Sequence, residues 1–133
     1  MSELGWGALR DDLEADVRRV TDRLRSLSLA RLAGPVPPHA SRADAARAVA
    51  QLMAEVAQGL ADRHAAREPS WRELPVLSDL AVGEQVAVTG HDLLGELATI
   101  RPTESVWSRG SRRTAREVVA AAAAALAETR RRL

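Results

Sequence analysis

The 133-residue sequence contains no cysteine, lysine, asparagine, phenylalanine or tyrosine. Without cysteine the chain can form no disulfide and no thiolate metal site, and it has no cysteine nucleophile. No run of about 18 uncharged apolar residues is present, so we expect no membrane span. Gly-rich phosphate loops, nucleophile elbows and dinucleotide fingerprints are also missing. The sequence therefore carries no strong catalytic signature, and we expect no cofactor.

The charge balance gives little indication of a polyanionic partner. All 19 basic residues are arginine, and the formal net charge is only +1. Three consecutive arginines occupy positions 130–132, just before Leu133, where they suit the negative end of a helix dipole. We therefore expect no nucleic-acid partner. The stretch from Glu3 to Asp12 contains no apolar segment of the kind found in secretory signals, so we predict a cytoplasmic protein.

The residues that are present favour an all-α fold. Aromatic residues make up 2% of the chain, all of them tryptophan, and Ile100 is its single isoleucine. Alanine, leucine, arginine and glutamate, which favour helices, dominate instead. The length is that of one ordinary domain, so we treat residues 1–133 as a single domain.

Apolar residues recur at helical spacing in four segments that are separated by glycine and proline. We predict helices over residues of about 8–32, 42–66, 84–100 and 112–132. Ser41 with Asp44, and Thr114 with Glu117, have the spacing of capping boxes at the start of two of them. The simplest arrangement is an up-down four-helix bundle, which homodimerisation could complete.

Residues 82–90 have two interpretations. Val86 to Val88, between Gly83 and Gly90, could form a short strand. The helical pattern accounts for more residues, so we predict a helix in which Gly90 allows a neighbouring backbone to come close.

Two narrow apolar stripes give the main functional hypothesis. A stripe this narrow cannot form a core alone, so it must pack against helices later in the chain or in a second copy. The predicted interaction residues are Leu13, Val17, Val20, Leu24 and Leu27 in the first helix and Val119, Ala122 and Leu126 in the last. We expect a small non-catalytic module that associates with itself or with another helical protein.

The segment Gly-His-Asp-Leu-Leu-Gly-Glu-Leu at 90–97 offers an alternative. It resembles the phosphoacceptor helix of histidine phosphotransfer domains, where leucine follows an exposed histidine by two residues and glycine follows it by four. It is also similar to the start of the dimerisation helix of sensor histidine kinases. The resemblance implies a helical bundle that carries a phosphoryl group on His91, although Leu94 stands where the phosphotransfer family usually has lysine.

A third possibility is a small apolar ligand held between the helices, with Trp71 or Trp107 as a lid. We predict that Trp71 plugs one end of the bundle. The alternative is that Trp71 is exposed and takes part in recognition. A metal site is not expected, because no His-x-x-x-His pair occurs and His39 and His64 lie at opposite ends of the second predicted helix.

Overall fold

The computed structural model describes residues 5–133, so part of the segment behind the cytoplasmic prediction lies outside the described residues. The chain is mostly helical, as predicted. Its elements are α1 (Ala8–Ser26), α2 (Leu29–Leu32), α3 (Arg42–Ala61), the 3-10 turn η2 (Asp79–Ala81), α4 (Val82–Leu97), β1 (Ser105–Ser108), β2 (Ser111–Thr114) and α5 (Ala115–Arg132). None of the described helices combines the length and apolar character needed to cross a bilayer.

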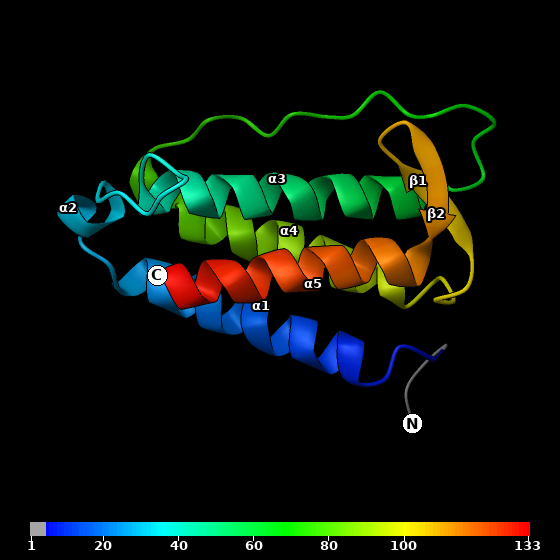
Figure 1. The fold of residues 1–133 in the computed structure, drawn as a ribbon, viewed down its shortest axis with the longest axis horizontal. Helices are drawn as coiled ribbons and strands as arrows, with labels where there is room; N and C mark the ends of the chain where they lie inside the picture. Colours follow the sequence, from blue (N-terminus) through cyan, green and yellow to red (C-terminus); the bar gives the residue numbers. More distant parts are fainter. Residues whose placement is uncertain (1–4) are drawn as a thin grey trace.

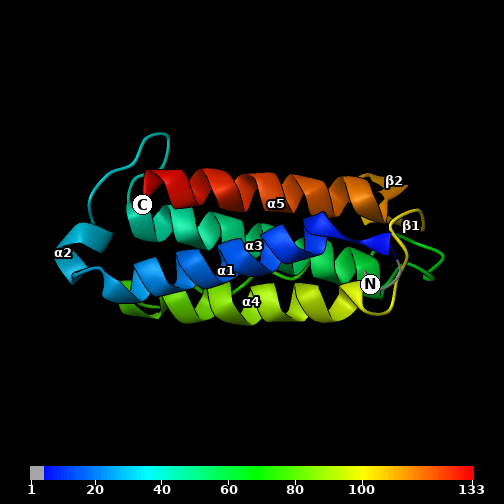
Figure 2. The same cartoon turned by 90° about the horizontal axis from the view of Figure 1, so that it is seen from below.

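The four long helices lie side by side, with α1 and α3 at opposite corners and α4 and α5 between them (Figures 1 and 2). The predicted up-down alternation is wrong. Helices α3 and α4 run in the same direction, and α1 and α5 run in the other. The reason is the connection at residues 62–78, which we call the strap and which returns along the length of α3 (Figure 1). An extended chain covers about 3.3 Å per residue against 1.5 Å in a helix, so the strap can span α3.

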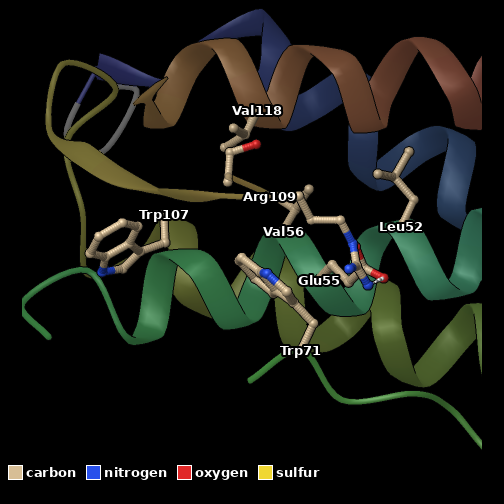
Figure 3. Close-up of a pocket in the computed structure, with 8 residues that line it drawn as sticks. Leu52, Glu55, Val56, Trp71, Trp107, Arg109 and Val118 are labelled. Atoms are coloured by element: carbon tan, nitrogen blue, oxygen red, sulfur yellow. Dashed lines mark hydrogen bonds and ion pairs between the residues drawn. The ribbon is translucent and has the colours of Figure 1, made fainter. Parts of the chain in front are cut away.

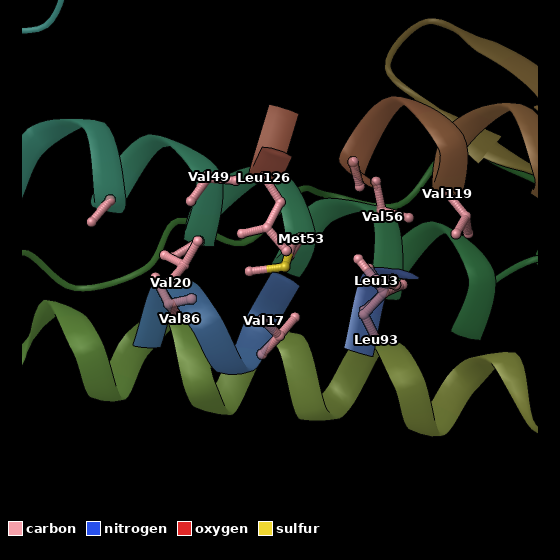
Figure 4. Packing of buried hydrophobic residues seen from close by; sticks show 14 of the residues in the cluster. Leu13, Val17, Val20, Val49, Met53, Val56, Val86, Leu93, Val119 and Leu126 are labelled. Carbon is pink, nitrogen blue, oxygen red and sulfur yellow. The ribbon is translucent and has the colours of Figure 1, made fainter. Parts of the chain in front are cut away.

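One cluster of buried aliphatic side chains joins all four long helices (Figure 4). Gly90 does mark a close approach, but of a side chain rather than of the predicted backbone, because a Cβ atom there would lie 2.6 Å from Cγ1 of Val17. The helical interpretation of residues 82–90 is also confirmed. Small residues thus allow α1 and α4 to approach each other closely.

The predicted helix ends differ from the observed ones. The first helix was predicted to continue to residue 32, but it ends at Ser26, and the short α2 follows after Leu27. The side chain of Ser28 accepts a hydrogen bond from the Arg31 amide at 3.2 Å and so starts a new helix. Helix α3 ends at Ala61 rather than near 66, and α4 occupies 82–97 rather than 84–100.

The all-α prediction misses a small antiparallel hairpin before α5. Strands β1 and β2 pair from Ser105 opposite Thr114 to Ser108 opposite Ser111, and Gly110 turns the chain with a φ of +74°. The predicted capping box of Thr114 is confirmed, and it starts α5 at Ala115. The last helix is therefore shorter than the predicted 112–132.

Trp6, not Trp71, closes one end of the bundle. Its side chain is 2% exposed, and its indole N–H donates to the carbonyl oxygen of Ile100 at 2.8 Å. Trp71 instead lies half-buried on the strap, so the prediction that it plugs the bundle end is wrong. It is one of the two tryptophans left near the surface.

Candidate functional site

All eight predicted interaction residues lie in the core of the chain itself. None is more than 8% exposed, and they belong to the same buried cluster. The stripe of α1 therefore packs against other helices of its own chain, which was one of the two arrangements expected. In the folded chain these side chains are not available at the surface.

His91 is exposed on α4, the position that phosphoryl transfer would need. It lines two shallow grooves, one between α3 and α4 and one between α1 and α4, and Arg72 of the strap borders the first. Within residues 5–133 the imidazole has no hydrogen-bond or ion-pair partner. Phosphoryl transfer on His91 remains a prediction.

The histidines do not form a cluster. His39 follows a cis Pro37–Pro38 bond in the loop before α3, His64 follows α3, and His91 lies within α4. No group of three or more histidine, aspartate or glutamate residues in the described part of the chain could hold a metal ion.

Trp71 and Trp107 face one cavity of about 160 Å³ (Figure 3). The cavity lies where the strap and the hairpin meet α3 and α5. Its lining has three parts: an aliphatic surface, two indole walls and a charged rim. Leu52, Val56 and Val118 form the aliphatic surface. Trp71 and Trp107 form the indole walls. Glu55 and Arg109 form the charged rim, with Ser108 beside them.

Two glutamines of α3 hold the strap that carries Trp71. Gln51 accepts from the Leu74 amide at 2.8 Å and donates to the Arg72 carbonyl at 2.9 Å. Gln58 accepts from the Arg72 amide at 3.1 Å and donates to the Ser70 carbonyl at 2.9 Å. The two glutamines are seven residues apart, so they lie on the same face of α3. They bind the strap as a neighbouring strand would.

Glu68 connects the strap to the hairpin. Its carboxylate accepts from the Trp71 indole N–H at 2.7 Å and from the Gly110 amide at 3.0 Å. The bond from Trp71, followed by that from Gly110, lowers the pKa of Glu68 below its ordinary value. The Trp107 indole donates in turn to the Ala65 carbonyl at 3.1 Å, so both indoles are fixed by hydrogen bonds.

Gly59 brings the two tryptophans together on α3. A Cβ atom at this position would overlap the backbone carbonyl oxygen of Trp107 and would lie 3.4 Å from Cη2 of Trp71. A glycine in the middle of a helix lowers its stability, and here it allows strand β1 to rest directly on the helix.

Two of the three hairpin arginines lie over the indole rings. The Arg109 guanidinium is 5.8 Å from the centre of the Trp71 ring and binds both carboxylate oxygens of Glu55, at 2.8 and 3.0 Å. This pairing, supported by Gln51, lowers the pKa of Glu55. The Arg112 guanidinium is 4.7 Å from the centre of the Trp107 ring. In such cation–π contacts the guanidinium is attracted to the face of the ring.

Comparison with protein family models, with curated proteins and with solved structures finds no match for this chain. The site is therefore defined by its geometry alone. The sequence pointed to Trp71 and Trp107 but missed Glu55 and Arg109. A usable signal was the row of polar residues Gln51, Glu55 and Gln58, which share one face of an otherwise alanine-rich helix.

Proposed function

We propose that this protein is a non-catalytic module that associates with another protein, and that the cavity between Trp71 and Trp107 binds an apolar side chain of that partner. The observation behind the proposal is the combination of an aliphatic surface, two indole walls and a guanidinium at the rim. Tryptophan and arginine are the residue types most enriched at the energetic centres of protein interfaces.

The size of the cavity supports one side chain as the occupant. Sites for drug-sized ligands measure about 300–1,000 Å³. The 160 Å³ between the tryptophans is smaller and is comparable to the volume of a single large apolar side chain. A free apolar molecule of about the size of benzene is the second candidate, since a cavity of about 150 Å³ can hold one.

The rim offers a polar contact beside the apolar one. Arg109 uses Nε and Nη2 to bind Glu55, while its Nη1 has no partner among residues 5–133. The side chain is 61% exposed. A backbone carbonyl or carboxylate of the partner can therefore bind Arg109 without breaking its pair with Glu55.

Self-association remains part of this proposal, but it needs another surface than the buried stripe of α1. Four exposed apolar side chains lie around the contact between α2 and η2, at the far end of the strap: Leu29, Val76, Leu77 and Leu80. We propose this end patch as the surface through which a second copy binds.

The cavity can be tested with capped amino acids as probes. We expect N-acetyl-leucinamide and N-acetyl-phenylalaninamide to shift the indole N–H signals of Trp71 and Trp107 in nitrogen-15 NMR spectra. The buried Trp6 signal should stay fixed and serves as an internal reference.

Leu52→Phe should abolish these shifts, because it narrows the cavity. Leu94→Phe is the matched control, since both leucines are half-buried on helices and Leu94 borders the groove between α1 and α4 instead. Absence of shifts at both tryptophans, or equal shifts in the Leu52→Phe variant, would contradict the proposal. Shifts caused by benzene but by neither capped amino acid would favour the free ligand.

A further inference from the structure

We propose that the outer edge of the strap binds an extended segment of another protein by β-strand addition. This inference goes beyond the proposed function, because it concerns the backbone of residues 70–74 rather than the cavity between the tryptophans. It adds a second contact whose chemistry is hydrogen bonding between main chains.

The inner edge of the strap is already occupied. Residues 68–78 contain no turn or bend and run along α3 (Figure 1). The backbone groups of Ser70, Arg72 and Leu74 bind the side chains of Gln51 and Gln58. These are alternate residues of an extended chain, so their N–H and C=O groups share one edge.

The residues between them direct their backbone groups to the other edge. The N–H and C=O groups of Trp71 and Glu73 have no hydrogen-bond partner anywhere in the described range 5–133. Arg72 and Glu73 are exposed, and the next carbonyl on this edge, that of Pro75, accepts from Gln85 of α4 at 2.8 Å, so the open part of the edge ends before Pro75. A row of unpaired N–H and C=O groups of this kind is a template for another strand.

Two prolines set the length of the edge. Pro69 and Pro75 lack an N–H group and border the open residues on either side. A partner can therefore find both an N–H and a C=O group only at Trp71 and Glu73, because the two prolines offer no donor and the Pro75 carbonyl already binds Gln85.

Charge and register favour another protein over a second copy of the strap. In a symmetric antiparallel pair of straps, the register centred on Trp71 places Glu73 opposite Pro69. The register centred on Glu73 places Trp71 opposite Pro75. The register that avoids both prolines places Arg72 opposite Arg72, and like charges directly opposite each other are destabilising. The occupant that fits is a foreign extended segment with an acidic residue opposite Arg72 and a basic residue opposite Glu73.

Selection from a phage-displayed library of random dodecapeptides tests the inference. Peptides enriched on the folded protein are synthesised, and their affinities are measured by fluorescence anisotropy. Glu73→Pro should weaken the affinity about tenfold or more, because it removes an outward N–H group and leaves the bonds to Gln51 and Gln58 in place. Val76→Pro is the matched control, since it adds a proline to the same strap outside residues 70–74.

Methylation of the peptide provides a second measurement that does not depend on a variant. N-methyl groups on every second peptide residue should weaken binding about tenfold when those residues direct their N–H groups at the strap. Methylation of the residues in between should leave binding nearly unchanged. Equal effects of both methylation patterns, failure to enrich any peptide, or affinities that survive Glu73→Pro would overturn the inference. Peptides that lose affinity for Leu52→Phe but not for Glu73→Pro would overturn strand addition while supporting the cavity as the binding site.

Discussion

Gly59 decides how closely the hairpin approaches α3, and with it the distance between the two tryptophans. The carbonyl of Trp107 occupies the place where a side chain would begin, and the Trp71 ring lies beside it. Gly95 in α4 is different, because nothing lies within 4 Å of a Cβ atom built there. Comparing substitutions at Gly59 and Gly95 therefore separates the effect of the contact with the hairpin from the general effect of glycine in a helix.

Gly59→Ala should destabilise the fold by about 1–3 kcal/mol, because the added methyl group must displace the backbone of β1. Gly95→Ala should be neutral or stabilising by up to about 1 kcal/mol, since alanine favours the helix. Urea unfolding followed by circular dichroism measures both changes. Equal effects of the two substitutions would show that Gly59 does not position the hairpin.

Glu68 should make the environment of Trp71 sensitive to acid. Its pKa in the folded chain is lowered, so its contribution to stability is complete above the unfolded-state pKa of about 4.3 and is lost as the pH falls through the folded-state value. Tryptophan fluorescence should therefore change below about pH 4.3.

Glu68→Gln should remove most of this acid transition. The control is Glu128→Gln, because the pKa of Glu128 is also lowered but by Arg131 and Arg132, at the other end of α5. An acid transition that is unchanged by Glu68→Gln would contradict the role assigned to this carboxylate.

The strap and the hairpin are the two elements that build the site, and the sequence predicted them least well. Helices α3, α4 and α5 followed from apolar spacing and from the capping residues Ser41 and Thr114. The hairpin gave a weaker signal, because one short strand, Ser-Arg-Arg-Thr, carries no apolar residue. The strap has no periodic pattern of its own, since side chains of another element hold it.

This dependence of the strap on α3 can be tested by proteolysis. Gln51→Leu combined with Gln58→Leu removes the groups that bind Ser70, Arg72 and Leu74. Trypsin should then cut after Arg72 at least about tenfold faster, because local opening no longer has to break these bonds.

Gln85→Leu is the control for this experiment. Gln85 donates to the Pro75 carbonyl at 2.8 Å and so holds the far end of the strap. Its loss should leave the cleavage rate after Arg72 nearly unchanged. Similar rates in the double variant and in the unmodified protein would show that the glutamines do not hold the strap.

At the scale of the whole molecule, the four long helices bury their apolar faces against one another, so association has to use other surfaces. Apolar periodicity does not reveal those surfaces. The stripe of α1 identified a helix and its buried face, yet the other helices of the same chain cover that face. Periodicity reports which side of a helix is buried, but not which element buries it. The parts of these surfaces that lie outside the predicted helices include Trp71, Trp107 and Arg109 of the cavity and Val76, Leu77 and Leu80 of the end patch.

The end patch predicts self-association at micromolar concentration. Light scattering should give the mass of a dimer, and Leu80→Glu should return it to that of the monomer, because it places a charge in an apolar interface. Arg112→Glu, a charge change on the hairpin, should not. A monomer at micromolar concentration would remove this part of the account.

The alternative role of His91 gives a further test of a non-catalytic protein. After incubation with acetyl phosphate we expect no acid-labile, base-stable phosphoryl label. A label present in the unmodified protein and lost in His91→Gln would establish phosphoryl transfer and contradict the function proposed above.

The most direct test of protein association is photo-crosslinking in the cells that make this protein. The crosslinking residue p-benzoyl-phenylalanine replaces exposed Glu73. This position lies near the cavity rim: the hydrogen bond to Glu55 raises the pKa of Arg109, and the charges of Glu55, Glu68 and Glu73 add to that effect. Asp12, exposed on α1 at the opposite corner of the bundle from α3 and the strap, takes the same substitution as the control. We predict a covalent adduct with another polypeptide from position 73 and little or none from position 12. No adduct at position 73, or equal yields at both positions, would contradict the proposal that this protein binds its partner beside the two tryptophans.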